Sequence, residues 1–237
     1  MELTLQSLEI CRYKTGSSQF CGFKTDQINM KDISQEDSSR AFDNLIENDL
    51  ITLINEEIHV SALGQFFVKM MTDPEIMISV ENQSTHKKVN IYIRDAYYLA
   101  VLNEKYEPIS EGGDKLLVDL LPTLKEVVGA FIHGIAYEGD PKSAGTESTE
   151  IKDHSIHITG ISWDKARKID AQMDILGDYQ GRTIDYHLHK KTDSLIIDES
   201  ITDCQISSLV NTLTGWMFDR LSILEERREN HYGETIC

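Results

Sequence analysis

The chain lacks a Cys-x-x-Cys pair and every other cysteine spacing that is typical of a zinc site. Its four cysteines are widely separated, which suits free thiols in a reducing compartment: Cys11, Cys21, Cys204 and Cys237. No run approaches the roughly 18 apolar residues of a membrane-spanning helix. The first ten residues contain no basic region followed by an apolar block. We therefore expect a cytoplasmic protein with no bound metal and no stable membrane insertion.

Positive charge is also scarce, with 23 lysines and arginines against 40 aspartates and glutamates and a formal net charge of -17. Such a surface repels a phosphate backbone and gains little from counterion release, on which nucleic-acid binding depends. No phosphate-binding glycine loop, Gly-x-Ser-x-Gly elbow or His-Glu-x-x-His helix occurs. With 40% hydrophobic residues the chain can build a globular core. We expect no nucleic-acid partner, no enzymatic activity and no cofactor.

A helix, a short hairpin and a second helix are predicted within residues 35–71. Apolar residues recur at three- and four-residue spacing in the first helix. Two β-branched runs, 51–54 and 57–60, are joined by two residues and predict a hairpin like a wing. Ser61 can cap the second helix, which ends before Asp73 and the proline that follows it. This winged-helix-like unit is typical of proteins that bind nucleic acid or another protein, and its local charge is acidic.

The rest of the first half is predicted as a meander followed by a helix. Alternation and polar turns predict short strands at 76–80, 89–93, 97–102 and 105–109. Leucines at helical spacing predict one helix over 116–131, with Pro122 kinking or splitting it.

A polar run over 138–150 contains proline, glycine and hydroxyl residues and is predicted to be a linker. It separates an N-terminal half, 1–137, from a C-terminal half, 151–237, within one compact domain.

The second half repeats the same order of elements. Strands are predicted at 155–161, 169–176, 182–190 and 194–198, with a turn at 177–181. Thr202 and Gln205 form a capping box that predicts the start of one long terminal helix. The repetition concerns architecture only, because the two halves share no residue-level identity.

Six polar residues of two predicted strands are expected on one face of the sheet: Asp170, Gln172, Asp174, Asp185, His187 and His189. His187, His189 and Asp185, with His154 and His157 upstream, could supply the ligands of a metal site. A sheet face exposed to solvent gives the same alternating pattern, and we favour this interpretation. The terminal helix is apolar around much of its girth, with Trp216 at one margin of the stripe and Phe218 outside it. Such a helix is sandwiched within the fold or an oligomer, or it forms a groove for an amphipathic helix.

Residues 41–71, AFDNLIENDLITLINEEIHVSALGQFFVKMM, resemble the EspG and EsaE type of cytosolic chaperone that serves type VII secretion systems. The resemblance extends to the preceding LQSLEICRYKTGSSQFCGF segment, to the following DPEIMISV, and to the two-halved order of strands and terminal helices. It covers nearly the whole chain, as a match of pattern and order with few fixed residues.

The resemblance implies an α/β (α+β) fold with a pseudo-two-fold central antiparallel sheet flanked by helical bundles. It implies a chaperone or adaptor that binds small helical secreted proteins or toxins, keeps them soluble and targets them for export. Client contact would involve the C-terminal half, at the region of Asp170, Gln172, Asp174, Asp185, His187, His189, Trp216 and Phe218. The chain would act as a monomer or homodimer.

Two other functions stay open at this point. One is a transcriptional regulator whose winged unit reads DNA, against which the acidic charge weighs. The other is a hydrolase or metal enzyme at the strand face that carries His187 and His189.

Overall fold

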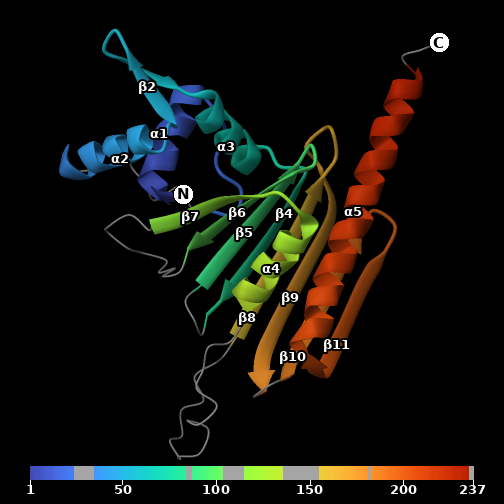
Figure 1. The fold of residues 1–237 in the computed structure, drawn as a ribbon. Helices are drawn as coiled ribbons and strands as arrows, with labels where there is room; N and C mark the ends of the chain where they lie inside the picture. Colours follow the sequence, from blue (N-terminus) through green and yellow to red (C-terminus); the bar gives the residue numbers. More distant parts are fainter. Residues whose placement is uncertain (24–34, 84–86, 104–114, 136–154, 181–182, 235–237) are drawn as a thin grey trace, which may run out of the picture.

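The computed structural model describes residues 1–23, 35–83, 87–103, 115–135, 155–180 and 183–234 (Figure 1). The helices in these ranges are α1 Leu5–Thr15, α2 Gln35–Glu47, α3 Ala62–Thr72, α4 Leu124–Ile135 and α5 Ile206–Glu234. The strands of the first half are β1 Glu2–Thr4, β2 Ile51–Ile54, β3 Glu57–Val60, β4 Ile76–Asn82, β5 Lys87–Arg94, β6 Tyr97–Asn103 and β7 Lys115–Leu121. The second half adds β8 Ser155–Trp163, β9 Ile169–Gln180, β10 Thr183–Thr192 and β11 Ile196–Gln205. The protein is therefore a mixed α/β structure with a large antiparallel sheet.

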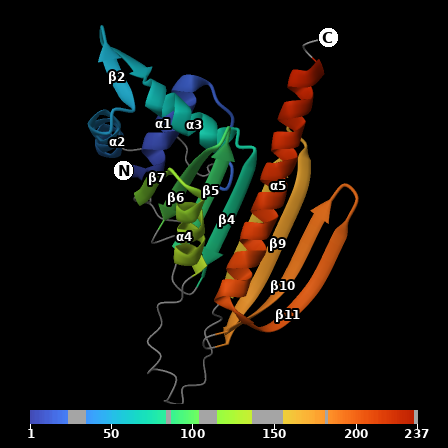
Figure 2. The same cartoon turned by 45° about the vertical axis from the view of Figure 1, so that its right-hand side comes forward.

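Nine strands form the main sheet in the order β1-β7-β6-β5-β4-β8-β9-β10-β11. β4 to β7 make one meander and β8 to β11 a second, and the two meet where β4 pairs antiparallel with β8. One helix follows each meander, and α4 and α5 lie on the same face of the sheet (Figures 1 and 2). The two units are thus arranged about the β4–β8 pair as if by a two-fold axis perpendicular to the sheet.

The opposite face of the sheet is covered by a lobe made of α1, α2, α3 and the β2–β3 hairpin. Leu8, Leu45 and Met71 from the three helices pack in one cluster with Tyr92 and other residues of β4 to β7. β4 and β5 are therefore buried almost throughout, as expected of strands that are covered on both faces. β9 buries only alternate residues, such as Met173. The first half has three layers, and the described part of the second half has two.

The segments predicted as helix, hairpin and helix have these structures in α2, β2–β3 and α3. Asn55 and Glu56 both have positive φ, 52° and 66°, as the two-residue turn of a twisted hairpin requires. Ser61 caps α3, because its Oγ accepts a hydrogen bond from the backbone N–H of Gly64 at 3.1 Å. Ala41 of α2 and Phe67 of α3 are buried in the lobe.

The prediction of a helix over 116–131, kinked or split at Pro122, is wrong before Pro122 and confirmed after it, where α4 begins at Leu124. Residues 115–121 form strand β7, which pairs with β6 and β1 and buries Leu116 and Val118 while Leu117 is exposed. Leucines spaced for a helix also satisfy this alternation over a short stretch, and Pro122 disfavours a helical conformation at the residue before it. The helix that follows starts only at Leu124, after a capping box between Thr123 and Glu126.

Two boundaries in the second half were also predicted incorrectly. β9 continues through the predicted turn at 177–181 as far as Gln180, and Gly177 lies inside the strand. A Cβ at Gly177 would lie 3.0 Å from Ile184 Cδ1, so the absent side chain makes room for the neighbouring strand. The predicted cap at Thr202 lies within β11, and α5 starts at Ile206. Thr202 lies where the register of the β10–β11 pair shifts, and pairing resumes at Cys204, so the strand continues past the capping pattern.

The predicted strand at 105–109 and the predicted linker at 138–150 lie outside the described residues. In the part of the chain that the structure describes, no helix combines the length and the apolar character that crossing a bilayer demands.

Two helical glycines provide a matched test of the lobe. A Cβ at Gly64 in α3 would lie 2.5 Å from the backbone oxygen of Leu50 and 2.8 Å from Val60 Cγ1, whereas a Cβ at Gly215 in α5 meets nothing within 4 Å. Gly64→Ala should therefore lower the free energy of unfolding by about 2 kcal/mol. Gly215→Ala should raise it by about 0.5 kcal/mol or more through helix propensity. Urea unfolding followed by circular dichroism measures both, and equal effects would contradict the packing of α3 on β2–β3.

Candidate functional site

The outer face of the second half, opposite α5, is a polar surface built from four neighbouring strands. We call it the histidine face and define it by the outward residues of four neighbouring strands: His157, Thr159, Gln172, Asp174, Leu176, Asp185, His187, His189, Asp198 and Ser200. Their neighbours in sequence, such as Ile158, Ile175 and Leu188, point into the core beneath α4 and α5. No described element covers this face.

His187 and His189 share a carboxylate on the edge strand. His187 Nε2 lies 2.6 Å from Asp198 Oδ1, and its Nδ1 lies 3.2 Å from Ser200 Oγ. His189 Nδ1 is 3.9 Å from Asp198 Oδ2. The side chains of His187 and Asp198 are 51% and 59% exposed, so water screens the pair strongly. The pair orients the imidazole without removing it from solvent.

A second group forms around Asp174 on β9. Its Oδ2 accepts a hydrogen bond from Gln172 Nε2 at 2.7 Å, and its Oδ1 lies 3.7 Å from His157 Nε2 and 3.4 Å from Thr159 Oγ1. All four side chains lie on adjacent strands in direct register or two residues apart. The predicted sharing of one face by Gln172 and Asp174 is therefore observed, with His157 as an additional member.

Leu176 is an apolar residue in the middle of this polar surface. It is paired in register with His157 on one side and His187 on the other, and it is 58% exposed. A shallow depression of about 410 Å³ lies around it, lined also by Asp185 and Ser200. The alternation of the strand could have indicated the exposure of Leu176. The odd-numbered residues 171–179 are buried, so the side chain of an even-numbered residue points to the outer face.

The histidine face is open to solvent. Its groups are exposed or half-exposed and lie on a broad, open depression, whereas catalytic acids and bases are usually held in a cavity that shields them from water. Among the described residues, no group of three or more histidines, cysteines or carboxylates is arranged to hold a metal ion. Imidazole, amide and carboxylate groups around one leucine can instead contact a polar partner with an apolar anchor.

The prediction that Asp170 shares this face is wrong. The pairing of β8 with β9 shifts between Ser162 and Trp163, so a bulge reverses the direction of Asp170. Its carboxylate binds α5, where Arg227 Nη2 lies 2.8 Å from Oδ1 and Arg220 Nη1 lies 3.8 Å from Oδ2. This hydrogen bond from Arg227 to Asp170 raises the pKa of the guanidinium. Asp170 therefore attaches α5 to the sheet.

Trp216 and Phe218 also lie apart from the histidine face. Trp216 is 4% exposed and packs in the core, where its ring would lie 2.9 Å from a Cβ at Gly160. Phe218 is 44% exposed on α5. Because α5 packs on the inner face through Leu213 and Met217, the sheet separates Phe218 from His187. The eight predicted residues thus fall into an outer group of five, an ion-paired aspartate, a core tryptophan and an exposed phenylalanine.

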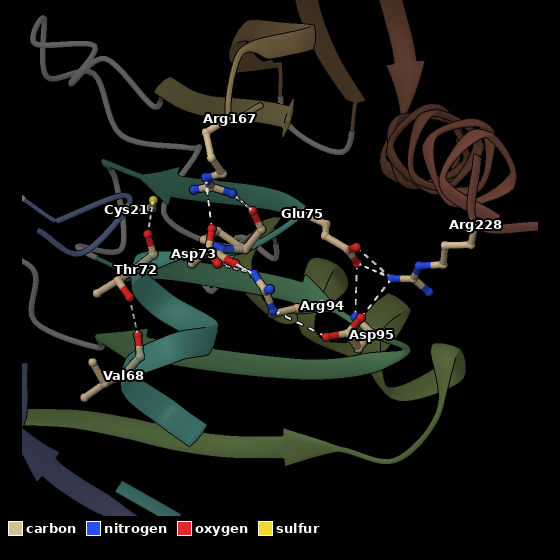
Figure 3. Close-up of polar contacts among 10 residues, drawn as sticks. Cys21, Val68, Thr72, Asp73, Glu75, Arg94, Asp95, Arg167 and Arg228 are labelled. Carbon is tan, nitrogen blue, oxygen red and sulfur yellow. Dashed lines mark hydrogen bonds and ion pairs between the residues drawn. The ribbon is translucent and has the colours of Figure 1, made fainter. Parts of the chain in front are cut away.

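A network of ion pairs at one end of the sheet was not predicted (Figure 3). Asp73 binds Arg94 through Nη1 at 2.5 Å and Arg167 through Nε at 2.9 Å. Arg228 of α5 binds Glu75 at 2.6 Å and Asp95 at 3.3 Å, and the hydrogen bond to Glu75 raises the pKa of Arg228.

This network joins the end of α3, the β4–β5 region, the β8–β9 loop and α5, which are far apart in the sequence (Figure 3). Burial raises the pKa of the nearby Cys21 thiol, and Arg167 opposes that effect. The six charged residues of the network neutralise one another, so they are best explained as a structural anchor for the second half of α5.

No protein-family model and no curated protein matches this chain. The described residues define a mixed α/β protein with a large antiparallel sheet, whose second half has an exposed polar face.

The same substitution, aspartate to asparagine, can be made on each face of β9 to test which face Asp170 occupies. Asp170 and Asp174 lie on opposite faces, with side chains 10% and 31% exposed. Asp170→Asn should lower the free energy of unfolding by about 2 kcal/mol, because two arginines on α5 lose their carboxylate. Asp174→Asn should change it by no more than about 0.5 kcal/mol. Urea unfolding of both variants measures the difference, and a larger loss for Asp174→Asn would contradict the assignment of Asp170 to the helix face.

Proposed function

We propose that the chain is a cytosolic chaperone or adaptor of the EspG and EsaE type, which binds small helical substrates of a type VII secretion system. It acts by binding and not by catalysis, keeps its client soluble and directs it to export. The observation that supports this proposal most is the arrangement of two meander–helix units about the β4–β8 pair. The resemblance implies this pseudo-two-fold sheet, and the order of strands agrees with it.

The histidine face is the client surface that we propose. A client helix needs an apolar anchor and a polar rim, and Leu176 is surrounded by Asp174, His187 and other polar groups. The face lies in the C-terminal half, where the resemblance implies client contact. Asp170 and Trp216 are left out of this surface because their side chains bind α5 and the core.

The helix–hairpin–helix unit has a chemistry that suits a protein partner better than DNA. Leu53 and Ile54 near the hairpin turn are 60% and 52% exposed, and the nearby Glu57 side chain is 82% exposed. Apolar and acidic groups at the tip of a wing give no attraction to phosphate. This supports the adaptor over the transcriptional regulator.

The proposal is tested by co-expressing the chain with each small helical protein encoded beside it. Size-exclusion chromatography with light scattering should reveal a stable complex with one of them. Leu176→Asp should weaken that complex about tenfold or more, because it places a charge at the apolar centre of the face.

Phe218→Asp is the matched control, since Phe218 is similarly exposed but lies on the α5 side of the sheet. It should leave the complex intact. Loss of binding in Phe218→Asp alone would place the client on α5, and the absence of a complex with every neighbour would contradict the chaperone proposal. Circular dichroism of each free variant checks that it is folded.

A further inference from the structure

The main sheet ends in two edge strands of very different length. β1 has 3 residues, whereas β11 has 10 and, among the described strands, pairs with β10 alone. β11 is the outermost strand in both views, and no described element lies beyond its free edge (Figures 1 and 2). A long edge strand presents a row of unpaired N–H and C=O groups that another strand can bind. The edge of β11 is thus a surface of its own, at right angles to the histidine face.

The first part of β11 is regular enough to accept a further strand. Six consecutive residues, from Ile196 to Ile201, pair one to one with β10. After them the strand is interrupted at Asp203, which has φ of 52° and donates its backbone N–H to Asp185 Oδ1 at 2.7 Å. A bulge of this kind ends regular pairing on the free edge as well. The pairing region is therefore limited to about six residues.

The side chains of β11 are acidic, and this charge determines which kind of strand can pair with its free edge. The ten residues of β11 include Asp198, Glu199 and Asp203 and contain no lysine, arginine or histidine. Asp198 and Glu199 are adjacent, so they point to opposite faces of the sheet. Beside them, Leu195 and Ile196 are 55% and 63% exposed. A strand on this edge would meet carboxylates on both faces and an apolar pair at one end.

A second copy of the chain is a poor occupant of this edge. Pairing residues 196–201 of β11 with the same residues of a second copy would place four carboxylates on one two-stranded ribbon, between two protomers that each carry a net charge of -17. Like charges on paired strands are destabilising, and acidic edge residues are a known protection against self-association. A basic strand has the opposite balance, because cross-strand pairs of opposite charge are favourable.

We propose that the free edge of β11 binds an extended segment of a partner protein that carries two adjacent basic residues flanked by β-branched ones. The segment pairs with Ile196 to Ile201 through backbone hydrogen bonds. Its basic residues lie opposite Asp198 and Glu199, one on each face, and an apolar residue lies against Ile196. This inference shares Asp198, whose carboxylate also contacts His187, with the histidine face. It does not rest on the proposed client surface, because it concerns backbone groups at the edge of the sheet and an extended partner, whereas that surface is a face for a helix.

The test uses a fluorescent ten-residue peptide with two central lysines flanked by valine and threonine, a length that matches β11. Fluorescence anisotropy with the full chain should show binding that weakens as salt is added. The same peptide with valine replaced by proline keeps its charge but cannot complete a strand, and it should bind about tenfold more weakly. Equal binding of both peptides would reduce the interaction to simple charge attraction and overturn the proposal.

Two matched charge reversals locate the site. Glu199→Lys on β11 should weaken the lysine peptide about fivefold, because an attractive cross-strand pair becomes repulsive. Glu57→Lys changes the net charge equally but lies on β3, in the N-terminal lobe, and should leave binding unchanged (Figure 1).

Hydrogen exchange measured by mass spectrometry should show slower exchange of backbone amides in 196–201 when the lysine peptide is bound. Equal loss of binding in both variants, protection elsewhere, or no binding of the peptide would each overturn the proposal. Failure of this test leaves the co-expression result untouched, so the two proposals can fail separately.

Discussion

The pairing of β4 with β8 is the interaction on which the rest of the architecture depends. Seven residues of β4, from Ile76 to Asn82, pair in continuous register with β8. This contact joins two meanders that otherwise end in open edges, and it places α4 and α5 over one shared core. Because the two strands are antiparallel, the second meander is rotated relative to the first by half a turn. The same contact therefore determines both the length of the sheet and the side on which its helices lie.

Coverage by the N-terminal lobe makes the two halves chemically different. β4 and β5 carry apolar residues on both faces, such as Ile78 and Tyr92, because the lobe covers the face that α4 does not. β9 and β10 face no lobe, so buried residues alternate with half-exposed or exposed ones over 171–179 and 184–188, and all of the latter except Leu176 are polar. Alternation of this kind is typical of antiparallel strands that have one face exposed to solvent. The polar surface of the second half is thus a consequence of where the lobe ends.

Sequence reasoning was successful where one local rule acts alone. The alternation of β9 and β10 predicts the common face of Gln172 and His187, and the Ser61 cap predicts the start of α3. It failed where two rules compete, as at Thr202, where a capping pattern lies inside a strand that resumes its pairing with β10 at Cys204. It failed again in β7, because leucines over seven residues satisfy the helical and the strand period equally well.

The candidate site shows a different limit, which concerns contacts between distant segments. Strict alternation along the strand would put the side chains of Asp170 and Asp174 on the same face. A bulge in the pairing with β8 turns the Asp170 side chain to the opposite face. The bond from Arg228 to Glu75 joins residues 153 positions apart, so no local pattern could reveal it. Burial of Trp216 likewise depends on a residue far away in the sequence. Gly160 of β8 has no side chain and so leaves space for the indole ring. Surfaces made by a single strand were thus predictable, whereas side chains that secure α5 to the sheet were not.

The net charge of -17 connects the exposed face and the open edge. A sheet that leaves both an edge strand and a face uncovered is prone to pair with copies of itself. On β11 this is opposed by Asp198, Glu199 and Asp203, which repel a second copy. On the histidine face Asp174 and Asp198 have the same effect. Repulsion between copies therefore disfavours self-pairing of this sheet, whereas the basic segment that we propose as a partner meets no such repulsion.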